Sequence, residues 1–232
     1  MVTKGAALRW LENRYLQRHL HGRGMEIGAL WRRFPMPRNA RVWYVDRLNR
    51  AGLQHHYPEL QGDIVAPDLL AEATQLPVPP ASLDFLIASH VLEHLPFPLM
   101  ALRSWYDALA PGGVLLLKIP DMRYTFDVHR ARTSLAHLLQ EHDNPEGFDN
   151  RAHYAEWVEK VGGHDPSSPG FEPTVQNLME QNHSIHFHAW IDDDVRELVR
   201  FTQRTWRLEW KPVVFWGARF YRKEITLLLL RK

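Results

Sequence analysis

A glycine and two carboxylates stand where strands of a sheet would end and a ligand could bind. Gly28 closes the apolar segment 25–28, Glu26 lies within it, and Asp46 follows the next apolar segment, 41–45. In an open α/β sheet, ligands bind outside the carboxyl ends of the strands, where glycine lets the backbone approach and an acid on the next strand binds a ribose hydroxyl. The three residues predict a nucleoside site; alternatively, Gly28 only turns the chain and Asp46 only ends a strand.

Histidines supply a second kind of chemistry. His90 ends the segment 82–90, at the edge where the ligand would lie, and His186 and His188 are two apart on a segment that we expect to be extended, so their side chains share a face. A neutral histidine suits the removal of a proton from a substrate. We predict His90 first, and His186 or His188 second, in that role. For His186 and His188 the alternatives are substrate contact, shared metal binding and a structural role; we predict no metal site.

Two short motifs point to other enzymes. Residues 22–28, GRGMEIG, nearly spell a dinucleotide fingerprint, but we expect Gly22 and Gly24 before the strand, where they cannot form the phosphate-binding turn. Residues 90–94 spell H-x-x-E-H, a zinc-peptidase motif, but this motif directly follows a core strand. We therefore favour neither an NAD enzyme nor a peptidase.

Composition limits the class of protein. The chain has 232 residues, 45% of them hydrophobic, which predicts one globular domain over 1–232. Lysine plus arginine number 28 against 27 acids, so we predict no nucleic-acid partner, and the absence of cysteine excludes thiol chemistry. The longest apolar run near the end, 225–230, is far short of the roughly 20 residues that span a bilayer. Without an apolar signal-peptide stretch, the expected location is the cytoplasm.

The elements that would position these residues alternate between strands and helices. The apolar patterns predict strands at 25–28, 41–45, 63–65, 82–90 and 112–120, and helices at 6–20, 95–109 and 192–204. Closing strands at 208–216 and 220–230 flank Gly217 as an antiparallel hairpin. The predicted fold is α/β, a Rossmann-like, doubly wound, mostly parallel seven-stranded sheet. Residues 121–185, polar and rich in histidine, predict a helical insertion or lid after strand five, with short helices at 130–140 and 153–161.

Four blocks of sequence resemble a known family. In order, they are MEIGA, VWYVD, LDFLIASHVLEHL and LAPGGVLLLKIPD. This order is similar to class I S-adenosylmethionine-dependent methyltransferases, in particular a small bacterial group related to the type 11 domains. RYTFD (123–127) and SIHFHAW (184–190) are similar to segments of one subgroup that is often encoded with, or fused to, glycosyltransferases. The resemblance covers nearly the whole chain.

The resemblance implies a cofactor, S-adenosyl-L-methionine, and residues that bind it. For the methionine part these are Glu26, Gly28 and Ala29; for the ribose, Asp46 with Arg47; for the adenine amino group, Asp68 or its competitor Glu72; and at the methyl-transfer face, Ser89, His90 and His94. The glycine-rich turn of the family is reduced here, since Gly28 is followed by Ala29, Leu30 and Trp31. Pro35 and Pro37 also shorten the first crossover, as in other members of the subgroup.

The function that this resemblance implies is methyl transfer to an oxygen or nitrogen of a small polar acceptor. The genetic context favours a sugar, nucleotide sugar or glycan intermediate, and a glycosyltransferase partner. Arg123 and Arg130 would pair with an anionic acceptor, with Tyr124, His153, His186 and His188 in the same pocket. Two alternatives stay open: a cofactor-binding scaffold or regulator of glycan assembly without activity, and a reaction other than methylation.

Overall fold

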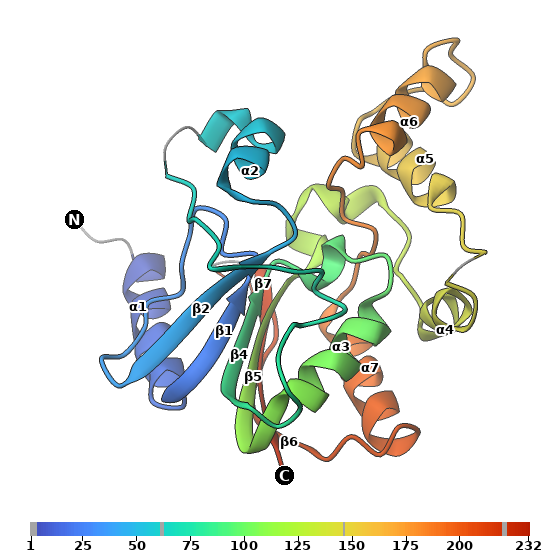
Figure 1. The fold of residues 1–232 in the computed structure, drawn as a ribbon. Coiled ribbons are helices and arrows are strands. Elements are labelled where there is room, and N and C mark those ends of the chain that lie inside the picture. Colours follow the sequence, from blue (N-terminus) through green and yellow to red (C-terminus); the bar gives the residue numbers. More distant parts are fainter. Residues whose placement is uncertain (1–3, 61–62, 146, 220–221) are drawn as a thin grey trace.

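A single seven-stranded sheet organises the chain (Figure 1). The computed structural model describes residues 4–60, 63–145, 147–219 and 222–232. The spatial order of the strands is β3-β2-β1-β4-β5-β7-β6, with β1 to β5 parallel and β7 antiparallel to both β5 and β6. The predicted fold class is confirmed. The strands are β1 (Gly22–Ile27), β2 (Ala40–Asp46), β3 (Leu69–Leu70), β4 (Leu83–Ser89), β5 (Leu109–Pro120), β6 (Trp210–Trp216) and β7 (Glu224–Arg231).

Helices cover both faces of this sheet. They are α1 (Lys4–Gln17), α2 (Arg50–His56), α3 (Pro98–Ala108), α4 (Leu135–Asp143), α5 (Arg151–Lys160), α6 (Phe171–Glu180) and α7 (Asp192–Arg204). On one face, α3 and α7 bury Trp105 and Leu198 against the strands, while Leu16 of α1 and the following Leu20 pack on the other face. Because both faces are covered, β4 and β5 consist largely of consecutive buried apolar residues.

Two predicted elements differ from those observed. The third strand is at 69–70, not at 63–65. Ile64 and Val65 are buried, which accounts for their apolar character, but the Val65 N–H donates to the Leu30 carbonyl in a loop, and the hydrogen bonds to β2 begin only at Asp68. In the C-terminal hairpin, β7 begins at Glu224; of the predicted strand 220–230, positions 220 and 221 lie outside the described residues.

The N-terminal helix forms but turns a different face to the core from the one that its spacing predicts. Leu8, Leu11, Tyr15 and Leu16 recur at helical spacing, which predicts that they share the buried face, but the first three are 40%, 56% and 39% exposed and only Leu16 is buried. The helix reaches the core only near its C-terminal end, where Leu16 packs with Phe85 of β4 and Leu116 of β5. Within the part of the chain that the structure describes, no helix combines the length and apolarity needed to cross a membrane.

The insertion between β5 and α7 builds a small unit of its own. Figure 1 shows α5 and α6 packed as a hairpin that projects beyond the sheet. Its interior contains Tyr154, Val158, Phe171 and Val175. These residues pack with Ile185 and Phe187, which lie in the segment that leads from the hairpin back to the sheet. The residues that follow the hairpin therefore pass back over the carboxyl edge of the sheet, where a ligand would lie.

Gly22 and Gly24 lie inside β1 and not before it. A Cβ atom on Gly24 would lie 2.4 Å from the Phe85 carbonyl oxygen of the neighbouring strand and 2.3 Å from the Phe85 ring. We expect Gly24→Ala to lower the free energy of unfolding by about 2 kcal/mol, since overpacking of a core costs about 1–3 kcal/mol. Urea denaturation measures it. Gly5→Ala, in open space on α1, is the control; equal loss in both variants would contradict the packing role of Gly24.

Candidate functional site

A cavity of about 1140 Å³ opens at the carboxyl ends of β1, β2 and β4. Its floor includes Gly28 after β1, Asp46 at the end of β2, and Ser89 with His90 at the end of β4. The insertion supplies the opposite wall through residues 182–184 and Phe187. The site thus has the position that the strand ends predicted, and its volume exceeds that of a pocket for one drug-sized ligand.

The turn after β1 is shaped by Gly28. This glycine has a φ of +63°, a conformation that costs other residues energy, and an added Cβ would lie 2.9 Å from Cγ2 of Val91. Its N–H donates to the Val45 carbonyl at 2.9 Å, so the chain turns sharply at the strand end. A backbone without a side chain therefore faces the cavity at this point, and a ligand can approach it closely.

Glu26 secures the loop that replaces the first crossover helix. Its Oε1 accepts a hydrogen bond of 2.8 Å from the Phe34 N–H, while the buried Oε2 has no hydrogen-bond partner among the described residues. Burial raises the pKa of Glu26 to about 7, against the opposing effects of the Phe34 hydrogen bond and the charge of Arg33. Because the residue borders the cavity, Oε2 is available to a cationic amine of a ligand.

The raised pKa of Glu26 makes stability depend on pH. Between pH 4.5 and about 7 the folded protein keeps a proton that the unfolded chain has lost, so this group's stabilising contribution, complete below pH 4.5, is lost as the pH rises through 7. We expect Glu26→Gln to remove this loss. Relative to wild type, the variant should gain up to about 3 kcal/mol between pH 4 and pH 8. Thermal denaturation of both proteins at pH 4 and pH 8 measures this gain. A stability difference between variant and wild type that does not change with pH would contradict the raised pKa of Glu26.

Asp46 and Arg47 form the end of β2. Burial raises the pKa of Asp46, and the nearby Glu72 adds to the rise. The Asp46 carboxylate accepts a long hydrogen bond, 3.4 Å, from the Leu48 N–H and a further one from the Arg47 backbone, but it borders the cavity, and each carboxylate oxygen can accept more than one hydrogen bond. Arg47 Nη2 donates to the Asn182 carbonyl at 3.3 Å and thereby links β2 to the insertion. The arrangement suits a ligand with two adjacent hydroxyl groups at Asp46.

Of the two acids predicted for adenine, Glu72 borders the cavity and Asp68 does not. Asp68 accepts a hydrogen bond of 2.8 Å from the Tyr44 N–H through Oδ2, and thereby fixes the start of β3 to β2. Because the third strand lies at 69–70, Asp68 directly precedes it, and Glu72 follows its carboxyl end, where the cavity lies. Of the two acids, Glu72 is therefore the one placed to meet a ligand in the cavity.

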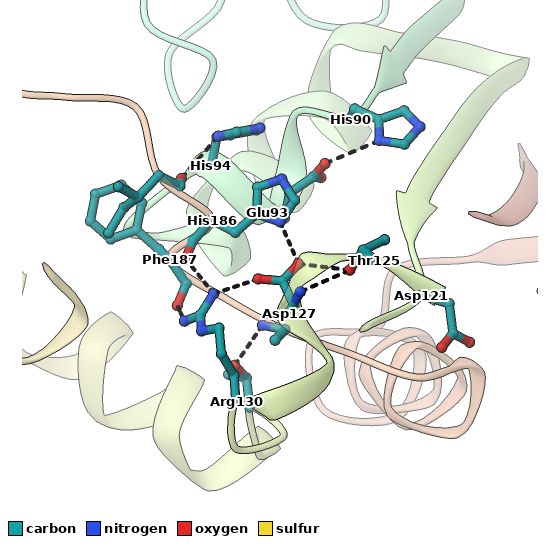
Figure 2. Close-up of polar contacts among 12 residues, drawn as sticks. His90, Glu93, His94, Asp121, Thr125, Asp127, Arg130, His186 and Phe187 are labelled. Carbon is teal, nitrogen blue, oxygen red and sulfur yellow. Dashed lines mark hydrogen bonds and ion pairs between the residues drawn. The ribbon is translucent and has the colours of Figure 1, made fainter. Parts of the chain in front are cut away.

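His90 is held between two carboxylates. Its Nε2 lies 3.0 Å from Glu224 Oε2. Its Nδ1 lies 3.5 Å from Glu93 Oε1 (Figure 2). Desolvation opposes a charged imidazole here, but the hydrogen bond to Glu224 and the negative charge of the nearby Glu93 outweigh it and raise the pKa of His90 to about 10. At neutral pH, His90 therefore already holds a proton, contrary to the neutral base that the sequence predicted.

His94 differs from His90 in its protonation. Its Nδ1 lies 2.9 Å from the carbonyl oxygen of Ile185, which fixes the hydrogen on that nitrogen. Burial lowers the pKa of His94 to about 4, and the nearby His186 adds to the fall, so the ring is neutral at physiological pH. His94 borders the cavity, and the hydrogen bond at Nδ1 leaves Nε2 with a free lone pair.

The residues predicted to bind the acceptor are not gathered around the cavity. Six of them lie outside its lining: Arg123, Tyr124, Arg130, His153, His186 and His188. Arg123 pairs with Asp121 and Asp192 at 2.6 Å each, and its guanidinium lies over the Tyr124 ring.

Functional candidates that the sequence did not single out are Thr125, Ser184 and Glu224, all of which border the cavity. Glu224 carries a signal in retrospect, since it begins an otherwise apolar strand.

His153 and His188 belong to a second, buried cluster around Glu141 of α4. Glu141 Oε1 lies 2.8 Å from His153 Nε2 and 2.9 Å from His137 Nε2, and Oε2 lies 3.5 Å from His188 Nε2. Burial opposes ionisation of Glu141, but its hydrogen bonds to His137 and His153 lower the pKa to about 2. This network connects α4, α5 and the segment before α7, so we assign it a structural role.

Comparisons with known proteins agree with this site. A family model described as a methyltransferase domain matches residues 37–163. The fold and the cavity define a class I S-adenosylmethionine-dependent methyltransferase, and the chain belongs to this methyltransferase domain family. Its cofactor is S-adenosylmethionine: the unpartnered Glu26 Oε2, the Gly28 turn and the Asp46 carboxylate fit the cofactor's amine, backbone and ribose contacts. No curated protein sequence matches the chain.

Solved structures share the fold at low identity. A Rhodobacter sphaeroides protein described as a putative zinc-dependent alcohol dehydrogenase is 16% identical, with a TM-score of 0.56, and the match covers 96% of this chain and 90% of that one. The PH0226 protein of Pyrococcus horikoshii is 12% identical, with a TM-score of 0.51, over 100% and 93% of the two chains. At such identities the likeness concerns the fold alone.

Proposed function

We propose that the enzyme methylates an oxygen or nitrogen of a small polar acceptor that binds between the sheet edge and the insertion. The observation that carries this proposal is the cavity of about 1140 Å³, whose floor consists of strand ends and whose opposite wall consists of insertion residues. A nucleoside cofactor on Gly28 and Asp46 would occupy the β1–β2 side. The β4 side, at Ser89 and His94, is left for the acceptor.

The chain's own residues orient the two partners. Asp46 would bind the ribose hydroxyls, Glu26 Oε2 would accept a hydrogen bond from the amine of the methionine part, and Glu72 would accept one from the adenine amino group; all three residues border the cavity. When bound, the cofactor supplies a methyl group already activated by its sulfonium. The protein's remaining task is alignment, since holding two reactants in the correct geometry removes much of the barrier. Arg47, hydrogen-bonded to the Asn182 carbonyl, and residues 182–184 border the cavity on the side of the insertion.

His90 acts in this proposal as a positioning residue. Its imidazolium, already protonated at neutral pH, holds the carboxylates of Glu93 and Glu224 in place at the end of β4. Glu224 in turn binds Lys118 Nζ at 2.7 Å. His186 and His188, the other predicted bases, are buried outside the lining of the cavity, so neither is assigned the removal of a proton here.

The polar wall of the cavity supports a hydroxylated acceptor. Thr125, Ser184 and His94 present hydroxyl and imidazole groups to it. Together with the resemblance to proteins encoded beside glycosyltransferases, this wall favours a sugar, nucleotide sugar or glycan intermediate, and a glycosyltransferase as the partner that supplies or consumes it. Location in the cytoplasm stays a prediction from the sequence.

Calorimetric titration with S-adenosylhomocysteine, followed by a transfer assay with radiolabelled S-adenosylmethionine, tests the proposal. We expect micromolar binding and transfer of label to at least one member of a panel of sugars and sugar nucleotides. Binding without transfer to any acceptor would favour the scaffold alternative. Folded protein that fails to bind would contradict the proposed cofactor contacts.

A further inference from the structure

Glu93 is a buried carboxylate whose charge is poorly compensated. Its side chain is 0% exposed, and neither carboxylate oxygen has a hydrogen-bond partner among the described residues. The nearest cationic atom in an ion pair with it, His90 Nδ1, is 3.5 Å away, which is long for a hydrogen bond. An ionised carboxylate without hydrogen bonds in the interior is costly, so a group that would satisfy Glu93 is to be expected close by.

Two histidines meet Glu93 at this point. One potential ligand atom from each of Glu93, His94 and His186 lies within 4.8 Å of the others. Figure 2 shows the three side chains gathered beside Asp127 and Arg130. The His94 and His186 rings are 4.6 Å apart at their centroids and nearly perpendicular. Small rotations would therefore bring three ligand atoms to the 2.0–2.2 Å bond lengths that zinc makes to imidazole and carboxylate.

Both histidines are oriented in the manner of metal ligands. His186 Nδ1 lies 2.7 Å from Asp127 Oδ2, and His94 Nδ1 lies 2.9 Å from the Ile185 carbonyl oxygen. Metal-binding histidines commonly donate their second N–H to a carboxylate or a backbone carbonyl, which fixes the tautomer and the ring. Here these contacts leave Nε2 as the free nitrogen of each ring.

The backbone holds the three groups together. The Phe187 N–H donates to the Glu93 carbonyl at 2.7 Å, so the segment that carries His186 is tied to the turn that carries Glu93 and His94. Arg130 Nη1 binds Asp127 Oδ1 at 3.0 Å and the His186 carbonyl at 2.6 Å. These contacts hold the two backbone segments that carry the three ligand side chains next to each other.

We propose that Glu93, His94 and His186 bind a divalent transition-metal ion in the wall of the cavity. Two imidazoles and one carboxylate favour such an ion over Mg²⁺ or Ca²⁺, which prefer oxygen ligands. Three protein ligands would leave coordination positions open, and one of the three, His94, borders the cavity on its acceptor side. There the ion would bind and orient an acceptor oxygen. This role rests on the proposed function, whereas the existence of the ion site does not depend on it.

The site differs from the peptidase motif in the sequence. H-x-x-E-H would pair His90 with His94 on one turn of an α-helix, but residues 92–94 form a 3-10 turn, and His90 has a φ of +56° with its ring at Glu224. His186, far along the chain, takes the place of His90. The Glu141 cluster also has ligand-type groups, but there Oε1 is already bonded to His137 and His153.

Calorimetric titration of chelator-treated, untagged full-length protein with ZnCl₂ tests the proposal. We expect one site in the wild type. Glu93→Gln and His186→Ala should each weaken binding by at least about tenfold, the lower bound seen when even outer contacts of a metal site are removed. Glu141→Gln, the matched control in the second cluster, should keep the site. Absorption spectra with CoCl₂ would add the visible bands of a bound, low-coordinate ion.

The opposite results would overturn the proposal. These are no zinc binding by the wild type, undiminished binding by Glu93→Gln or His186→Ala, or loss of binding in Glu141→Gln alone. Titration of each variant with S-adenosylhomocysteine serves as the folding control, because none of the three substituted side chains borders the cavity. That titration also separates the two proposals: failure to bind S-adenosylhomocysteine contradicts the proposed function, whereas failure to bind zinc contradicts only the metal site.

Discussion

Replacing Asp46 by alanine is expected to weaken S-adenosylhomocysteine binding about 100-fold. The Asp46 carboxylate borders the cavity at the end of β2, and its two backbone hydrogen bonds, from Leu48 at 3.4 Å and from Arg47, leave lone pairs for two ribose hydroxyls. Hydrogen bonds to a charged group contribute about 1.5–3 kcal/mol each, and about 1.4 kcal/mol corresponds to a tenfold change in affinity. Two such bonds account for the expected loss, which calorimetry measures directly.

A matched control makes the Asp46 experiment specific. Asp63 is exposed and lies outside the cavity lining, so Asp63→Ala should bind S-adenosylhomocysteine as the wild type does. Asp46→Asn keeps one acceptor oxygen and should fall between wild type and Asp46→Ala. Equal affinity of Asp46→Ala and wild type, with both proteins folded, would show that the ribose contact has been assigned to the wrong residue.

Replacing Arg130 by methionine is expected to destabilise the fold by about 3–5 kcal/mol, the usual consequence of removing one partner of a buried ion pair. The Arg130 side chain is 1% exposed. Its guanidinium binds Asp127 at 3.0 Å, Glu156 at 2.8 Å and the carbonyl oxygens of His186 and Phe187 at 2.6 and 3.1 Å. Methionine would fill part of the space but leave two acids and two carbonyls without this donor. Urea denaturation measures the loss.

Arg132, two residues along the chain, is the control for Arg130. It pairs with Asp194 but its side chain is 53% exposed, so Arg132→Met should cost less than about 1 kcal/mol, as is usual for surface ion pairs. The experiment also separates the structural role from the acceptor-binding role that the sequence predicted. A variant Arg130→Met with unchanged stability and a raised KM for the acceptor would favour acceptor binding.

The sequence by itself determined the frame of the site. Alternating apolar and amphipathic segments predicted the parallel sheet and its hairpin, and α7 was placed at its observed bounds, 192–204. Gly28, Asp46 and Ser89 could be placed in one cavity because the carboxyl ends of parallel strands meet at one edge of a sheet. Such inferences need only local periodicity and a topological rule, so they survive without knowledge of side-chain contacts.

Tertiary structure alone decided the chemistry of the polar side chains. The charge of His90 comes from Glu224, and the burial of Arg130 comes from its contacts with residues 186 and 187. The cluster of Glu93, His94 and His186 joins a turn after β4 to the segment before α7. A pKa, an ion pair or a metal site depends on which groups face each other within a few ångströms, and these partners are far apart in the sequence. Residue type and spacing cannot supply that distance.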